Sequence, residues 1–131
     1  MNMNSKSLKI LLAEDNVLNQ KLIFLNLKKY GFTIDIANNG REALEKVKNN
    51  SYDLIIMDLM MPVMDGLEAS KKIREYEKSV NRYTKIIGLT ANTFDTDREK
   101  CLAHGMDEYM AKPFDLEEFL RIIKYLEIIE N

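Results

Sequence analysis

The chain has 131 residues, 46% of them hydrophobic, and its formal net charge is −2. This size suits one domain with a single core, and the charge gives no electrostatic case for nucleic acid as a direct ligand. No apolar stretch reaches the roughly 18 residues of a membrane helix, and residues 1–7 lack the apolar segment of a secretion signal. We therefore expect one cytoplasmic domain over residues 1–131, with its core at about 8–127.

Five short apolar runs predict β-strands. In chain order they span residues 8–13, 32–37, 53–57, 85–89 and 108–110. The first, third and fourth are almost continuous in Leu, Ile and Met, which is typical of strands that are covered on both faces. These runs therefore predict a parallel sheet.

Helix signals separate the strands. Leu18, Leu22 and Leu25 follow helical spacing, and Gly31 marks the end of that helix. A capping residue with Glu three positions later opens each of the other helices, in the pairs Asn39 and Glu42, Asp65 and Glu68, Thr96 and Glu99, and Asp115 and Glu118. The alternation predicts a doubly wound α/β domain, with five parallel strands and helices on both faces.

Polar residues lie just after four of the predicted strands. The first strand leads into Glu14 and Asp15, the third into Asp58, the fourth into Thr90 and the fifth into Lys112. Open α/β sheets bind ligands beyond the carboxyl ends of their strands, where the strand order reverses. With the order 2-1-3-4-5, the three carboxylates converge at that point and the other two residues lie beside them.

Three carboxylates in one pocket repel one another, and a divalent cation resolves the conflict. Ligands that are all oxygen atoms favour a hard ion, so we expect Mg²⁺, with Mn²⁺ as a substitute, rather than Zn²⁺. The expected ligands are Glu14, Asp15, Asp58 and the backbone carbonyl of Met60. The same set suits phosphoryl transfer onto Asp58, with Lys112 neutralising the charge of the transferred group.

At this point the chain resembles the receiver domains of two-component response regulators. The matching segments are 10–16 (ILLAEDN), 58–66 (DLMMPVMDG), 88–91 (GLTA) and 112–114 (KPF), in family order over roughly residues 8–126. Segments 14–20, 37–44, 89–92 and 101–109 are most similar to the receivers of hybrid sensor histidine kinases. Thr84 departs from the family, because a proline is common at the entry to the fourth strand.

The resemblance implies a flavodoxin-like fold with strand order 2-1-3-4-5 and a role for each matching residue. Asp58 would accept the phosphoryl group, Thr90, Ala91 and Lys112 would contact it, and Thr90 and Tyr109 would form the switch. Pro113 would follow a cis peptide bond.

The resemblance also implies a function. The chain would take a phosphoryl group from a sensor histidine kinase, a histidine phosphotransfer protein or a small phosphodonor. It would then change conformation at the face of helix four, strand five and helix five. It would not be an enzyme beyond its own phosphorylation and dephosphorylation. Whether it is a stand-alone regulator or a receiver from a hybrid histidine kinase stays open.

Two surfaces are hypotheses of partner contact. Val17, Leu18, Asn19 and Leu22 on the first helix are candidates for docking the phosphodonor, although Leu22 is also a core candidate. A second apolar line on the last helix, formed by Ile122, Tyr125 and Ile129, fits either a homodimer surface or the edge of the core.

Three other functions fit parts of the pattern. A degenerate receiver could serve as a scaffold alone. An aspartate-nucleophile phosphatase usually has a second acid two residues after the nucleophile, where this chain has Met60. A flavodoxin-like cofactor carrier would need a phosphate-binding loop after the first strand, where Glu14 and Asp15 stand instead.

Overall fold

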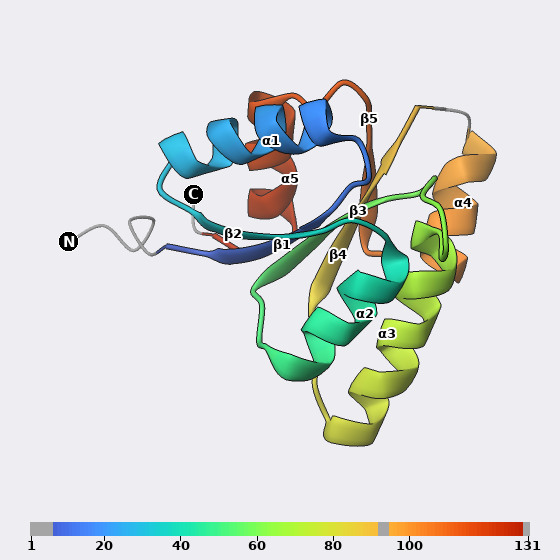
Figure 1. Ribbon diagram of the computed structural model, residues 1–131. Coiled ribbons are helices and arrows are strands. Elements are labelled where there is room, and N and C mark those ends of the chain that lie inside the picture. Colours follow the sequence, from blue (N-terminus) through green and yellow to red (C-terminus); the bar gives the residue numbers. More distant parts are fainter. Residues whose placement is uncertain (1–6, 92–94, 130–131) are drawn as a thin grey trace.

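The computed structural model describes residues 7–91 and 95–129 (Figure 1). In this part of the chain, strands and helices alternate strictly. In order they are β1 (Lys9–Ala13), α1 (Val17–Lys29), β2 (Thr33–Ala37), α2 (Gly40–Asn49), β3 (Leu54–Asp58), α3 (Gly66–Val80), β4 (Lys85–Thr90), α4 (Asp95–Ala103), β5 (Glu108–Ala111) and α5 (Leu116–Tyr125). The predicted cap at Thr96 lies outside the described side chains.

All neighbouring strands pair in parallel, in the order β2-β1-β3-β4-β5. This confirms the predicted doubly wound α/β fold. Strands β3, β4 and β5 each end one residue later than expected, because Asp58 still pairs with Leu89, and Thr90 with Ala111. Asp58 and Thr90 are therefore the last residues of β3 and β4, and the sheet itself fixes their backbones.

Helices α1 and α5 cover one face of the sheet, and α2, α3 and α4 cover the other (Figure 1). Neighbouring side chains on each central strand point to opposite faces, so the sheet separates two apolar clusters. On β3, for example, Ile55 and Met57 belong to the cluster under α2–α4, whereas Leu54 and Ile56 belong to the cluster under α1 and α5. Each fully buried Ile or Leu contributes about 2 kcal/mol to this packing.

Helix α1 packs on the sheet through a different face from the one that the leucine spacing suggested. Its buried residues are Gln20, Ile23 and Leu27, whereas Leu22 is 53% exposed. The interpretation of Leu22 as a core residue is therefore wrong. Apolar residues occur on all sides of this helix, so their spacing alone does not identify the packed face.

Capping residues begin three helices as expected. Asn39, Asp65 and Asp115 each accept a hydrogen bond from the backbone N–H three residues later. The carboxylate of Glu42 accepts from the backbone N–H of Asn38 at 2.8 Å rather than from that of Asn39. These contacts fix the angle at which the chain leaves the carboxyl end of the sheet.

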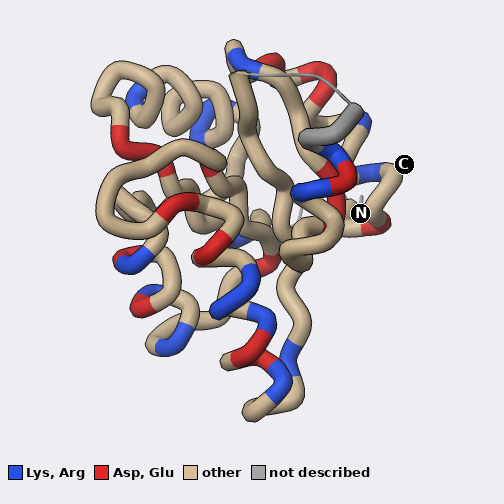
Figure 2. Tube along the Cα trace, turned by 90° about the vertical axis from the view of Figure 1, so that its right-hand side faces the viewer, with Lys and Arg blue, Asp and Glu red and all other residues tan. Residues whose placement is uncertain are grey.

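The second apolar line predicted for the last helix mostly fills the edge of the core, and it is not one helical line, because α5 ends at Tyr125 and Ile129 lies beyond it. Ile122 and Ile129 are partly buried against the cluster under α1 and α5, whereas Tyr125 is exposed. No helix of the described residues is both long and apolar enough to span a membrane. Basic and acidic residues are interspersed along the chain (Figure 2), in keeping with its small net charge.

The loop after Asp58 contains a strained residue. Val63 has a φ of 70°, and the N–H of Met64 donates to the carbonyl of Pro62 at 2.7 Å. Together these features describe a γ-turn with positive φ, a conformation that is unfavourable for a β-branched residue. The side chain of Val63 is 75% exposed, so packing does not offset the strain.

We therefore expect Val63→Gly to raise the free energy of unfolding by about 1 kcal/mol, because relief of strain exceeds the added backbone entropy of glycine. Val63→Ala is the matched control. It keeps the Cβ atom and should gain less than half as much in urea unfolding. A glycine variant no more stable than the wild type would contradict the interpretation.

Candidate functional site

Three carboxylates meet at the carboxyl ends of β1 and β3. Single oxygen atoms of Glu14, Asp15 and Asp58 lie within 4.8 Å of one another. The two strands are neighbours in the sheet, and the strand order reverses between them. The structure thus brings the predicted acidic residues together at the point where α/β sheets bind ligands.

Glu14 is the most deeply buried of the three, at 1% exposed. Its Oε2 accepts from the backbone N–H of Asn16 at 3.0 Å, but its buried Oε1 has no hydrogen-bond partner. Burial raises the pKa of Glu14, and the charge of Asp58 adds to this, although the Asn16 N–H and Lys112 oppose it. A buried oxygen without a donor, beside two other carboxylates, fits a hard cation such as Mg²⁺.

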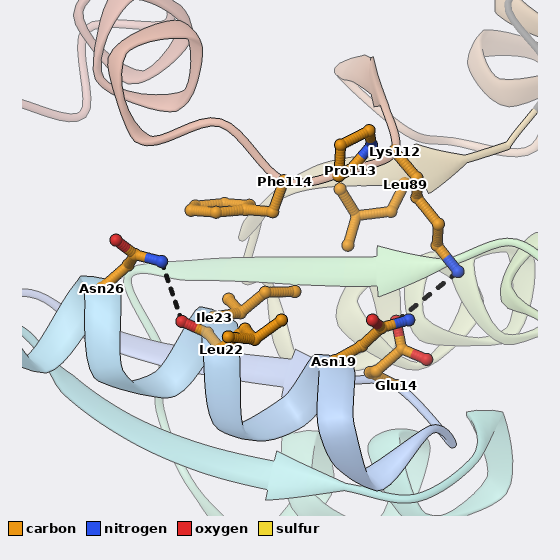
Figure 3. A pocket seen from close by; sticks show the side chains of 9 residues that line it. All are labelled: Glu14, Asn19, Leu22, Ile23, Asn26, Leu89, Lys112, Pro113 and Phe114. Carbon is orange, nitrogen blue, oxygen red and sulfur yellow. Dashed lines mark hydrogen bonds and ion pairs between the residues drawn. The ribbon is translucent and has the colours of Figure 1, made fainter.

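Lys112 reaches the carboxylates from the end of β5. Its Nζ lies 2.9 Å from Oδ2 of Asp58 and 3.6 Å from Oε1 of Glu14 (Figure 3). Burial acts to lower the pKa of Lys112, but its hydrogen bond to Asp58 and the charges of Asp58 and Glu14 outweigh this and raise it. The lysine therefore stays charged in the site. The peptide bond between Lys112 and Pro113 is cis, as predicted.

Thr90 and Tyr109 lie on the neighbouring strands β4 and β5, and Ala91 follows β4. Thr90 is buried at the end of β4, and its carbonyl accepts from the backbone N–H of Lys112 at 2.8 Å. Ala91 follows it and is exposed. Tyr109 on β5 pairs with Gly88 and packs, partly buried, against the cluster under α2–α4. The two candidate switch residues thus stand on adjacent strands.

Met60 follows the candidate nucleophile by two residues and contacts it through its backbone. Its backbone N–H donates to Oδ1 of Asp58 at 3.3 Å, and its side chain is exposed. The role of its carbonyl as a metal ligand stays a prediction.

The candidate docking residues divide between two hollows beside α1. Asn19 and Leu22 line a cavity of about 400 Å³ that opens next to Glu14 and Lys112 (Figure 3), whereas Val17 lines a shallower groove on the β2 side. Leu18 is exposed. Pro113, the predicted cis proline, also lines this cavity, together with four residues to which the sequence assigned no role, namely Ile23, Asn26, Leu89 and Phe114.

Gln20 is a further residue that sequence reasoning missed. It is buried, and its Nε2 donates to the carbonyl of Glu14 at 2.5 Å and to Oδ1 of Asn38 at 2.8 Å. It therefore ties the acidic loop to the end of β2. The sequence offered no signal for it, because the spacing of the apolar residues does not identify the packed face of α1.

Comparison with known proteins identifies the family. Residues 10–124 match the family model of the response regulator receiver domain. The chain is 43% identical over 122 residues to hybrid signal transduction histidine kinase K of Dictyostelium discoideum, and the matched region covers 88% of this chain and 10% of the kinase. It is 40% identical over 134 residues to histidine kinase 5 of Arabidopsis thaliana, covering 84% of this chain and 14% of that kinase. The chain belongs to the receiver domain family, and it spans only a small part of these relatives.

Solved structures agree. The receiver domain of the sensor histidine kinase PA1611 from Pseudomonas aeruginosa, which has a magnesium ion in its active-site cleft, superposes with a TM-score of 0.81 and is 39% identical, covering 92% of this chain and 97% of that one. A co-crystal of the Saccharomyces cerevisiae phosphotransfer protein Ypd1 with the Ssk1 receiver domain matches with a TM-score of 0.83 and 35% identity, over 90% and 87% of the two chains.

The raised pKa of Glu14 has a consequence for stability. The folded protein holds the Glu14 proton more tightly than the unfolded chain does, so the charged carboxylate destabilises the fold above its raised pKa. Without Mg²⁺ at pH 7, Glu14→Gln should therefore raise the free energy of unfolding by about 1 kcal/mol. The gain should fade as the pH falls through the raised pKa of Glu14, because the wild-type side chain is then also protonated.

Urea unfolding with and without Mg²⁺ checks this expectation. The wild type should gain stability from Mg²⁺, and Glu14→Gln should gain less. Glu45→Gln, which changes an exposed carboxylate on α2, is the control and should stay within about 0.5 kcal/mol of wild type. A Glu14 variant less stable than wild type without Mg²⁺ would contradict the argument.

Proposed function

We propose that this receiver domain is a phosphoryl-accepting signalling switch in which Asp58 takes the phosphoryl group. The observation that carries the proposal is the contact of the Lys112 Nζ with Asp58 at 2.9 Å, inside a group of three carboxylates. A phosphatase acting on other substrates is less well supported, because Met60 stands where its second acid would be. A scaffold without chemistry would not need a buried Glu14 Oε1 that accepts no hydrogen bond.

In the proposed reaction, an oxygen of Asp58 attacks the phosphorus atom of a phosphohistidine. The P–O bond forms as the P–N bond breaks, and the imidazole leaves with the bonding electron pair. Lys112 then turns from the carboxylate to an oxygen of the phosphoryl group, and the Thr90 hydroxyl and the Ala91 backbone contact the other oxygens. Position and charge supply most of the rate.

Glu14, Asp15, Asp58 and the Met60 carbonyl would hold Mg²⁺, with Mn²⁺ as a substitute. Bound there, the cation would neutralise the carboxylates and the charge on the phosphoryl oxygens. Glu14 and Asp15 follow β1, and Asp58 ends β3. The N–H of Glu14 donates to the carbonyl of Ala37 at 3.0 Å, and Asp58 pairs with Leu89, so the sheet holds the backbones of Glu14 and Asp58 before any ion binds. This fixed arrangement reduces the reorganisation needed for the reaction.

The conformational signal would pass from Thr90 to Tyr109. Withdrawal of Thr90 towards the phosphoryl group would leave room beside β4, and the partly buried Tyr109 on β5 would turn inwards to fill it. The readout is the face of α4, β5 and α5, which we propose as the contact for a partner or a second copy. The isolated chain would catalyse only its own phosphorylation and dephosphorylation, in the cytoplasm.

The phosphodonor would be a sensor histidine kinase or a histidine phosphotransfer protein that docks on α1. The support is the position of exposed apolar residues beside the site, with Leu18, Leu22 and Leu25 on one exposed stripe. Residues at spacings of four and three meet a partner helix along one seam. Leu25 therefore extends the docking surface expected from Val17, Leu18, Asn19 and Leu22.

The first test is phosphorylation by acetyl phosphate. Asp58→Asn should reduce incorporation to background, because its amide is not a nucleophile, and a chelator should do the same to the wild type. Asp65→Asn is the matched control, because asparagine still caps α3. Phosphate incorporation into Asp58→Asn at the wild-type level would refute the proposal.

The docking surface is tested with two phosphodonors. Leu18→Glu should lower the rate of transfer from a histidine phosphotransfer protein at least about tenfold, because docking supplies proximity, and should leave transfer from acetyl phosphate unchanged. Tyr125→Glu places the same charge on exposed α5, away from the site, and should change neither rate. Equal slowing with both donors would exclude α1 as the docking surface.

A further inference from the structure

A buried cluster of charged side chains lies at the opposite end of the sheet from Asp58. The guanidinium of Arg74, on α3, contacts Glu77 at 2.6 Å and Asp107 at 2.9 Å, and all three side chains are largely buried. The parallel strands start at this end, because Asp107 directly precedes β5. Buried charges need such partners, so the cluster holds together as a unit.

The same guanidinium joins three segments of the chain. Its Nε donates to the carbonyl of Gly105 at 2.8 Å, and one of its terminal nitrogens donates to the carbonyl of Thr84 at 2.7 Å. The ring of Tyr83 stacks 3.9 Å from its central carbon. The planar fork of an arginine can make these bonds together, whereas the point charge of a lysine cannot. Arg74 thus fastens α3 to the residues that precede β4 and β5.

Asp107 carries this attachment into the sheet. Its Oδ2 also accepts from the backbone N–H of Ile86 at 2.8 Å, and its own N–H donates to the carbonyl of Ile86. These two hydrogen bonds between Asp107 and Ile86 therefore fix the register in which β5 starts to pair with β4. The register continues through Gly88 and Tyr109 to the pair of Thr90 with Ala111. A slip of one residue would turn Tyr109 to the other face of the sheet.

The loop between α4 and β5 is packed directly on Arg74. Gly105 has a φ of 96°, and a Cβ atom at this position would lie 2.6 Å from the Cγ of Arg74. The backbone there has the left-handed conformation that favours glycine, and no side chain would fit. This end of α4 and β5 is therefore held by packing as well as by hydrogen bonds.

We propose that Arg74 is a positioning residue that forms the fixed end of the β4–α4–β5 unit. It sets the register that presents Thr90, Tyr109 and Lys112 to the site, and it confines the conformational change on phosphorylation to the end of these strands near Asp58. The inference rests on the proposed switch function, because it concerns how far that change extends.

The experiment is backbone amide hydrogen exchange with and without Mg²⁺ and beryllium fluoride, a mimic of the phosphoryl group. In the wild type, the mimic should change exchange at least tenfold for amides of residues 88–91 and 109–112. Exchange at residues 104–107, beside Arg74, should change less than twofold. Equal changes at both ends would overturn the proposal, because no fixed end would then exist.

Arg74→Lys keeps the positive charge that faces Glu77 and Asp107 but loses the fork. Without the mimic, exchange at residues 104–107 of this variant should be at least tenfold faster than in the wild type. With the mimic, exchange at residues 104–107 should also change, as it does near Asp58. Arg82→Lys is the matched control. Arg82, which follows α3, donates to the carbonyl of Val47 on α2 at 2.8 Å and, among the described residues, has no hydrogen bond to the 104–107 loop. Exchange in that loop should therefore stay within twofold of wild type.

The outcomes separate the two proposals. If Arg74→Lys leaves exchange at residues 104–107 unchanged in the absence of the mimic, the positioning role is wrong whatever the mimic does. If the mimic leaves the wild-type amides near Asp58 unchanged, the proposed phosphorylation switch fails. In that case the measurement without the mimic still decides whether Arg74 holds the loop.

Discussion

The mutual repulsion of Glu14, Asp15 and Asp58 is the constraint on which the rest of the site depends. Two adjacent strands force these carboxylates together, and the only cation that reaches them among the described residues is Lys112. The lysine balances part of the charge and leaves one oxygen of Glu14 without a donor. The fold therefore keeps a buried negative charge that stability alone would remove, which is typical of a functional site.

Most of this site could be predicted from the sequence, because its residues lie at or just after the ends of strands. Continuous apolar runs identified β1, β3 and β4, and the parallel topology then placed the residues after them at one edge of the sheet. The sequence could not show that Asp58 and Thr90 are themselves the last residues of their strands, because a polar residue ends an apolar run whether or not its backbone still pairs.

Helix α1 and the Arg74 cluster show where sequence reasoning ended. Leu22 and Ile23 are both apolar and adjacent, and nothing in their spacing told which of them faces the sheet. Arg74 meets Gly105 and Asp107 across about thirty residues of chain, and a contact of that kind follows from the tertiary fold rather than from any local pattern. The role of Gln20 was hidden for the same reason.

The sheet has one more property, which concerns how such a domain diversifies. Its two apolar clusters share no residue, since alternate side chains of each strand go to opposite faces. The proposed docking helix packs on one cluster, and Tyr109 packs on the other. A substitution that refits α1 to a new phosphodonor therefore leaves the packing beneath Tyr109 untouched. Partner choice and readout can change in separate steps of evolution while the chemistry between them stays the same.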